Sequence, residues 1–336
     1  MPRLTLRRLI VVLLGLVGPF AAQCGPGYKP IAREGQVELP DGNRVFYRLV
    51  GGGIDTLVAI PGGPAWSSRY LEEALLPLAR SHALLLYDPP GRGRSSAMPA
   101  DRLSMAGDVA ALEAVRAHFG IGAMKLLGHH YGAGVALLYA TLHPARVERV
   151  IFASPMPRQS SFVWRLALAR SDSAALTRYQ RAAADRLTDP MRFCRSFWGW
   201  DLSPAEEVEP QVVRRLAPLI CDATPDRLRE RDSLSRSIMR TNPGWQWADS
   251  LARLDRPALV IVGSRTPVLA TLAESWALPA TDARLLRLEG SSWFPWVDHP
   301  GTWISGVDRF LSGQWPDSAL IVREPPQAAA DTLRGT

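Results

Sequence analysis

The residues with the clearest chemical potential are two adjacent histidines in the segment Gly128-His129-His130-Tyr131-Gly132. A short apolar run ends at Gly128, and apolar residues at helical spacing follow over 135–142. This pattern predicts a sharp turn between a strand and a helix. Gly128 and Gly132 are expected there because strand and helix approach too closely for a Cβ atom. An imidazole at the centre of such a turn could bind a metal or carry a phosphoryl or acyl group.

A metal site would need further ligands, and the sequence offers Asp298 and His299 to complete a set with His130. Two arguments oppose it. Adjacent side chains on a sharp turn point apart, and residues 298–300 are better interpreted as the start of the last helix. We therefore expect His129 to be a packed residue behind the turn, His299 to lie at the surface, and no metal or other cofactor to be bound.

The elements that would position this turn alternate along the chain. Strands are predicted at 36–39, 43–50, 56–60, 82–87, 124–127, 147–153, 258–262 and 284–288, and helices at 68–78, 104–119, 135–142, 269–276 and 303–311. The first two strands are expected to be antiparallel, joined by Pro40-Asp41-Gly42. The remaining alternation indicates an α/β fold, with a mostly parallel eight-stranded sheet and helices on both of its faces.

The pattern changes after the sixth strand. From 155 to 254 apolar residues recur at helical spacing, strands disappear, and tryptophans gather at Trp164, Trp198, Trp200, Trp245 and Trp247. We interpret 155–254 as a helical lid inserted into a core made of 35–154 and 255–312. Residues 313–336 carry three prolines and little periodicity, which predicts a flexible tail.

Length and composition narrow the class of protein. The 336 residues fit one large domain with an inserted lobe, and 47% hydrophobic with 21% charged residues is ordinary for a globular chain. The formal charge of +7 comes mainly from arginines spread along the sequence and mixed with acids. Because no basic face or aromatic-basic repeat appears, we do not expect nucleic-acid binding.

The N-terminal segment is typical of export signals. Arg3, Arg7 and Arg8 precede a short apolar run over 9–17, which is too short to predict a membrane span. Residues 1–24 are expected to be a signal peptide, with two processing routes open. Ordinary cleavage would follow Cys24, whereas a lipoprotein signal would leave Cys24 as a lipid anchor and the only link to a membrane. We expect a periplasmic, extracellular or envelope-anchored protein.

If the protein is exported, the two remaining cysteines, Cys194 and Cys221, lie in a compartment that permits disulfides. An even pair in an oxidising compartment predicts a disulfide, which would contribute on the order of 3 kcal/mol in the chain-entropy account. The alternative is a pair of buried free thiols.

Three further motifs accompany the turn and carry a family resemblance. Pro61-Gly62-Gly63-Pro64-Ala65 is similar to a His-Gly-Gly-Pro-Gly loop, 88–95 to an Asp-X-X-Gly-X-Gly-X-Ser turn, and 291–296 to a segment that normally reads Gly-His-Phe-Pro-Trp. Over about residues 35–312 the chain resembles the α/β-hydrolase superfamily, and within it the prolyl-iminopeptidase branch. The resemblance implies the α/β-hydrolase fold, with 128–132 as its nucleophile elbow.

The same resemblance assigns a Ser-His-acid triad to positions that do not hold one here. The nucleophile position falls on His130, the acid position on Thr266 and the histidine position on Trp293. Thr266 cannot supply the charge that stabilises an imidazolium, and Trp293 has no basic nitrogen. We therefore expect no acyl-enzyme formed by the usual route.

The resemblance also implies features of the site other than the triad. The amides of Gly63 and Tyr131 are expected to form an oxyanion-hole-like site for an anion or a carbonyl oxygen. The prolyl-iminopeptidase branch also implies an amine-binding carboxylate in the lid. Glu206, Glu207 and Glu209 are candidates by location, with a solvated acidic face as the alternative. Ser67, Ser68, Ser95 and Ser96 border the site and are interpreted as helix-cap or turn residues.

These observations favour an exported pseudo-hydrolase that binds a small ligand or a protein partner in the inherited cleft without catalysis. One alternative is an enzyme, a hydrolase or lyase, that uses residues outside the triad such as His130. Another is a purely structural role at the cell envelope.

Overall fold

The computed structural model describes residues 31–53, 55–156, 225–241, 247–264 and 274–323, together with short pieces at 177, 184, 188–189, 216 and 219–221. In these parts the chain forms one eight-stranded sheet in the order β1-β2-β4-β3-β5-β6-β7-β8. The strands are β1 Ala32–Glu38, β2 Arg44–Val50, β3 Thr56–Ile60, β4 Ala83–Tyr87, β5 Met124–His129, β6 Val147–Ala153, β7 Ala258–Gly263 and β8 Ala283–Leu288.

The sheet is mostly parallel. β2 pairs antiparallel with both β1 and β4, and every pairing from β4 through β3 to β8 is parallel. The predicted fold class is therefore confirmed, including the antiparallel first pair. Parallel strands all end at the same edge of the sheet, so the segments that follow β3, β4, β5 and β6 meet there.

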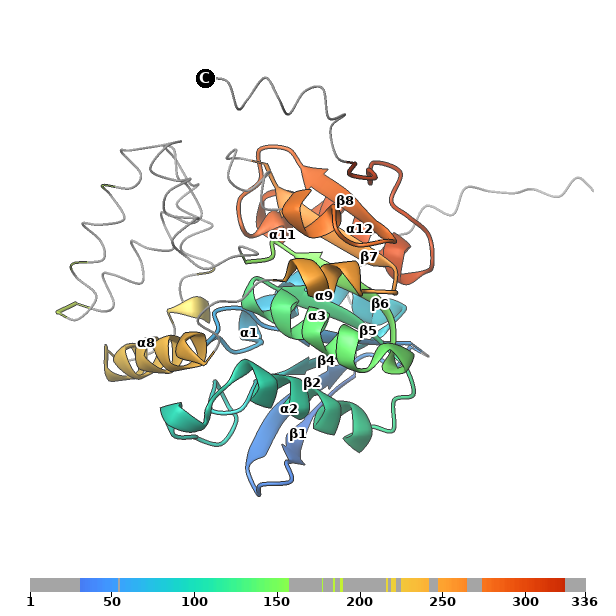
Figure 1. The fold of residues 1–336 in the computed structure, drawn as a ribbon. Helices are drawn as coiled ribbons and strands as arrows, with labels where there is room; N and C mark the ends of the chain where they lie inside the picture. The colour runs from blue at the N-terminus through green and yellow to red at the C-terminus, as the bar shows by residue number, and fades with distance from the viewer. Residues whose placement is uncertain are drawn as a thin grey trace, which may run out of the picture.

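Helices cover both faces of the sheet (Figure 1). They are α1 Arg69–Leu75, α2 Met105–His118, α3 Tyr131–Leu142, α8 Pro225–Arg240, α9 Ala248–Ala252, α11 Pro295–Asp298 and α12 Pro300–Leu311, with short 3-10 turns at Leu76–Arg80, Ala100–Arg102 and Pro144–Arg146.

Two apolar cores separate these helices by face. α2, α3 and α9 pack with strand residues such as Val58 and Leu126. α1, α11 and α12 pack with the alternate residues such as Leu57 and Leu127. Since side chains alternate along a strand, a strand buried on both faces reads as a continuous apolar run. This is the pattern from which the central strands were predicted.

Two helices of the described structure, α8 and α9, fall in the region predicted as a lid. Trp247 directly precedes α9, is buried and lies 5.1 Å from Trp276 between ring centroids. It occupies the space that a Cβ on Gly134 would need. Trp247 is thus a packing residue of the core. Within the described residues, no helix combines the length and the apolar character that a membrane span requires.

The tail prediction is wrong for its first part. Leu320 forms a two-bond antiparallel bridge with Leu285 of β8, Ala319 is buried, and Trp315 packs against Phe310 at 5.1 Å. Short-range periodicity misses such a segment because a bridge, an aromatic contact and polar contacts such as the Arg309–Asp317 ion pair hold it, without a repeating apolar pattern. Residues 324–336 lie outside the described part of the chain.

Candidate functional site

The turn between β5 and α3 has the backbone conformation expected at a nucleophile elbow. Its central residue, His130, adopts φ 51° and ψ −112°. A non-glycine residue in this region is strained by about 1–3 kcal/mol and persists only where the surroundings enforce it. Here the neighbouring strand does so, because the His130 amide donates to the Ala153 carbonyl at 3.1 Å and the Met156 amide donates to the His130 carbonyl at 3.3 Å.

The two elbow glycines are required by close approach, as predicted. A Cβ on Gly128 would overlap the carbonyl oxygen of Gly132, and a Cβ on Gly132 would overlap that of Ile60. Both atoms are backbone, so no side-chain rotation could relieve the clash. The helix therefore starts directly above the end of β5, and His130 is presented at the shared carboxyl edge of the strands.

The His130 imidazole lies next to two indole rings. The Trp66 ring is nearly parallel to it, at 6.0 Å and 20°, and the Trp293 ring is tilted by 71° at 5.6 Å. Nδ1 of His130 is buried and has no hydrogen-bond partner among the described residues. The sequence-based positions 130 and 293 are thus neighbours in space.

His129 points into a chain of hydrogen bonds that joins three loops. The Gly62 amide donates to Tyr70 Oη at 2.9 Å, Tyr70 Oη lies 2.7 Å from His129 Nδ1, and His129 Nε2 lies 3.2 Å from the Trp293 carbonyl. A carbonyl only accepts, so Nε2 carries the proton and Nδ1 accepts from the Tyr70 hydroxyl. His129 is buried behind the turn, as predicted, and it fastens the loop after β3 to the loop that carries Trp293.

Burial keeps both imidazoles uncharged. Desolvation lowers the pKa of His129 to about 3, with the adjacent His130 adding to the effect and the Trp293 carbonyl opposing it. Desolvation alone lowers the pKa of His130 to about 4. Both side chains are therefore neutral in the physiological range.

A pH dependence of stability follows from these shifts. Because the folded pKa of His129 lies below the unfolded value of about 6.5, protons bind the unfolded chain preferentially. The stabilisation is complete above pH 6.5 and is lost as the pH falls toward 3. Between pH 8 and pH 5 His129 should account for a loss of about 2 kcal/mol. Urea unfolding at each pH measures this, and His129→Gln should flatten the profile by that amount. An unchanged slope in the variant would contradict the assignment.

The predicted oxyanion-hole-like residues lie beside the elbow. Tyr131 is the first residue of α3, so its amide has no acceptor within the helix. The loop that carries Gly63 touches the turn, since a Cβ on Gly62 would lie 3.0 Å from Cβ of His130. Gly63 itself has φ +118°, a conformation suited to glycine. The convergence of the two amides on one point stays a prediction.

The alternative metal ligands are engaged elsewhere. Asp298 Oδ2 accepts from the Ser292 amide at 2.8 Å and from the hydroxyls of Ser292 and Ser291 at 2.7 and 3.1 Å. His299 Nε2 lies 2.8 Å from the Glu289 carbonyl. No group of three His, Cys, Asp or Glu side chains suited to a metal occurs in the parts of the chain that the structure describes.

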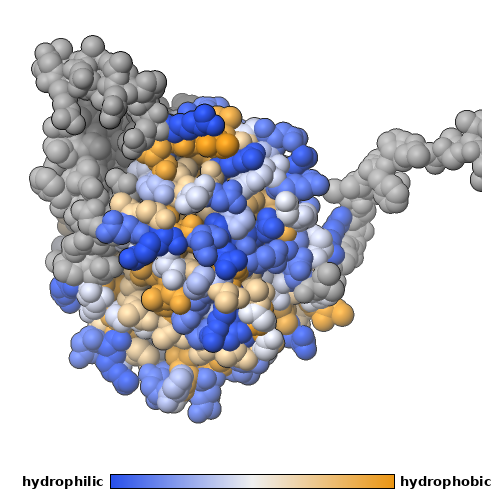
Figure 2. Space-filling model, turned by 45° about the vertical axis from the view of Figure 1, so that its right-hand side comes forward, coloured by the Kyte–Doolittle hydropathy of each residue, from blue (hydrophilic) through white to orange (hydrophobic). Residues whose placement is uncertain are grey.

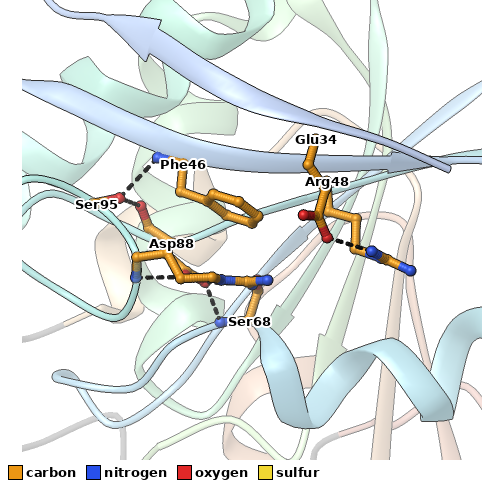
Figure 3. A network of polar contacts seen from close by, with 7 residues as sticks. Glu34, Phe46, Arg48, Ser68, Asp88 and Ser95 are labelled. Atoms are coloured by element: carbon orange, nitrogen blue, oxygen red, sulfur yellow. Dashed lines mark hydrogen bonds and ion pairs between the residues drawn. The ribbon is translucent and has the colours of Figure 1, made fainter.

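The Asp88 turn is braced by the serines that the sequence placed near the site (Figure 3). Asp88 is fully buried and accepts from the amide and hydroxyl of Ser68, both at 2.7 Å, and from the amide of Arg94 at 2.9 Å. Ser95 donates to the Asp88 carbonyl at 2.5 Å and accepts from the Phe46 amide at 2.9 Å. Ser68 is therefore no side-chain helix cap, because its hydroxyl is drawn to the buried carboxylate instead.

Sequence reasoning missed a buried ion pair beneath the elbow. The Arg92 guanidinium contacts Asp108 at 2.5 and 2.8 Å, and the Tyr131 hydroxyl donates to the same carboxylate at 2.7 Å. Both charged side chains are almost fully buried. The signal in the sequence was Asp108, an acidic residue on the otherwise apolar face of α2. The pair ties the turn after β4 and α2 to the residue that follows His130.

Several predicted residues lie outside the described part of the chain. These are Thr266, Cys194, Glu206, Glu207 and Glu209. Cys221 is described and buried, but without Cys194 the predicted disulfide stays a prediction.

Known proteins resemble this chain in sequence. Residues 55–291 match the family model described as alpha/beta hydrolase fold. The proline iminopeptidase of Levilactobacillus brevis is 25% identical over 285 residues, covering 80% of this chain and 93% of the relative. That of Saccharolobus solfataricus is 25% identical over 299 residues, covering 85% and 94%.

Solved structures agree on the fold. The proline iminopeptidase of Mycobacterium smegmatis superposes with a TM-score of 0.65 at 19% identity, covering 84% of this chain and 98% of the other. The esterase RhEst1 from Rhodococcus sp. ECU1013 superposes with a TM-score of 0.65 at 24% identity, with the same coverage. At these identities the likeness bears on the fold alone.

Proposed function

Since the chain belongs to the α/β-hydrolase family, we propose that it is a pseudo-hydrolase, which binds a small ligand in the cleft above the elbow without cleaving it. One observation carries the proposal: the strained central position of the turn, where this family places its nucleophile, is occupied by His130 with an uncharged imidazole. A side chain held in this way stands at the carboxyl edge of the strands, where the proposed cleft would lie, but it has no hydroxyl or thiol to attack with.

The neighbouring positions support the same proposal. Trp293 lies beside His130, where the family's histidine is expected from the sequence, and an indole offers an N–H donor but no base. Thr266, at the expected acid position, has no charge to orient an imidazolium. With all three roles vacant, only binding and oxyanion contributions would remain, about 10³ to 10⁴ over water.

A small ligand is preferred over a protein partner. On the face drawn in Figure 2, hydrophilic residues are interspersed with apolar ones over the described core. The exposed large apolar residues of the described chain are few, and are Ile31, Leu76, Leu142, Leu320 and Ile321. Binding in the proposed cleft beside Trp66 and Trp293 requires no such surface. We keep export, lipidation at Cys24 and the Cys194–Cys221 disulfide as parts of this proposal that rest on the sequence.

One observation favours a second candidate, an enzyme with histidine-centred chemistry. A neutral imidazole on a strained turn, beside the Tyr131 amide, could act as a nucleophile toward an activated acyl or phosphoryl group. Such an enzyme would form a transient acyl- or phosphohistidine and would lose all turnover in His130→Ala.

Two measurements on the purified chain separate the candidates. Under the leading proposal, a serine-reactive fluorophosphonate leaves the protein unlabelled and p-nitrophenyl acetate is hydrolysed no faster in its presence than with His130→Ala. Ester turnover that disappears in His130→Ala would favour the histidine enzyme. Labelling that is lost on replacing a single serine would overturn both candidates.

A further inference from the structure

A serine that the sequence did not single out lies next to His130. Ser154 directly follows β6, and β6 pairs with β5 such that Ala153 is opposite His129. Residues 130 and 154 are therefore consecutive neighbours at the carboxyl edge of the sheet. Hydrogen bonds from the His130 amide to the Ala153 carbonyl and from the Met156 amide to the His130 carbonyl close the backbone on both sides of Ser154.

Ser154 and His130 share two properties, and the first of them occurs at no other described non-glycine residue. Among the described residues they are the two non-glycine positions with a left-handed φ, 37° for Ser154 and 51° for His130. Each also has a buried polar atom without a hydrogen-bond partner, Oγ of Ser154 and Nδ1 of His130. Ser154 is fully buried, so its hydroxyl lacks bulk water as well.

Such a combination is costly. An unsatisfied buried polar atom loses its hydration without compensation, and a left-handed serine adds backbone strain. Buried polar groups in folded proteins are nearly always paired, and exceptions gather at sites where a ligand or an ordered water completes the bonding. Two such atoms on residues that are neighbours at the sheet edge could be satisfied by the same partner.

The surroundings of the two atoms indicate which chemical class of partner would fit them. Burial lowers the pKa of His130, and the rings of Trp66 and Trp293 lie against its imidazole. A charged group would have to give up its hydration there, at a cost that an uncharged group avoids. The Ser154 hydroxyl can donate and accept, and a neutral imidazole nitrogen does one or the other according to its tautomer. A group with both functions satisfies the pair in either case.

We propose that Ser154 is a ligand-contact residue, whose hydroxyl acts together with the His130 imidazole to bind one uncharged group that both donates and accepts hydrogen bonds, such as a carboxamide or a hydroxyl. This assignment rests on the proposed ligand-binding function of the cleft. The flanking indoles of Trp66 and Trp293 would hold the apolar part of the same ligand.

Three probes of similar size test the proposal on the full chain: phenylacetamide, phenylacetate and ethylbenzene. We expect phenylacetamide to bind more tightly than the other two by NMR titration. Ser154→Ala should weaken phenylacetamide about 10-fold, the loss of one hydrogen bond, and leave ethylbenzene unchanged. Ser154→Gly removes the same hydroxyl and tolerates φ 37°, so it should give the same result without a folding penalty. Ser237→Ala, at a buried serine on α8, is the matched control and should change neither affinity.

The outcomes distinguish failure of the proposed role of Ser154 from failure of the cleft proposal on which it rests. Ethylbenzene binding with no preference for phenylacetamide, or equal weakening of both probes in Ser154→Gly, would overturn the role of Ser154 and leave the cleft proposal standing. Tightest binding of phenylacetate would show that the site prefers a charged group, and would overturn the proposal that the bound group is uncharged. Failure of all three probes to bind would overturn the cleft proposal together with this one. In ¹⁵N spectra, phenylacetamide should shift the His130 Nδ1 resonance in the parent and not in Ser154→Gly.

Discussion

The triple variant His130→Ser, Thr266→Asp, Trp293→His should hydrolyse p-nitrophenyl esters at least about 10²-fold faster than the parent chain. General base catalysis by a positioned imidazole typically contributes 10² to 10⁴, and the elbow already holds the strained backbone that such a serine needs. The ring at position 293 lies 5.6 Å from that at position 130 between centroids. A histidine at 293 would therefore start within reach of the new hydroxyl.

The matched control keeps the new acid and histidine but lacks the nucleophile. His130→Ala, Thr266→Asp, Trp293→His should show no gain in ester turnover and no labelling by a fluorophosphonate, whereas the serine-containing triple variant should be labelled. A folded triple variant without activity would mean that the three positions do not converge. Because Thr266 lies outside the described residues, this experiment tests its placement most directly.

Asp108→Ala should destabilise the protein by about 3–5 kcal/mol. Removing the carboxylate leaves the Arg92 guanidinium buried without its countercharge and deprives the Tyr131 hydroxyl of its acceptor. Breaking a buried pair from one side typically costs this much, because the remaining charge stays desolvated. The urea midpoint of unfolding, followed by tryptophan fluorescence, measures the effect.

Two companion variants define the cause. Asp317→Ala breaks the exposed pair with Arg309, where solvent screens the charges, and should cost less than about 1 kcal/mol. Asp108→Asn keeps acceptors for the Tyr131 hydroxyl and should fall between the two. If Asp108→Ala cost no more than Asp317→Ala, burial of the Arg92 charge would not govern stability here.

The fold was predictable because its strands are buried on both faces. Val58 and Leu57 belong to different cores, so the strand between them reads as unbroken apolar sequence, and the helices between strands show their own spacing. The turn at 128–132 was equally accessible, since only glycine fits where the strand and helix backbones nearly touch. Local sequence carries both signals.

Other features depend on contacts between distant segments. The Ser68 hydroxyl donates to Asp88, 20 positions away, and does not cap its own helix. Arg92 pairs with Asp108, which lies 16 positions further along the chain in α2. The role of Ser154 follows from strand register and from backbone strain, which no local pattern encodes. The bridge of Leu320 to β8 likewise joins the C-terminal segment to a strand by a single pair of residues.

The hydrogen bonds that run from Gly62 through Tyr70 and His129 to Trp293 have a consequence for recognition. They make the rim formed by the loops after β3, β5 and β8 a single preassembled frame. A guest of matching shape would meet a surface that is already organised, and little conformational entropy would be spent on association. Discrimination on this side of the proposed cleft would then arise from steric exclusion of poorly fitting molecules, rather than from closure of the frame around them.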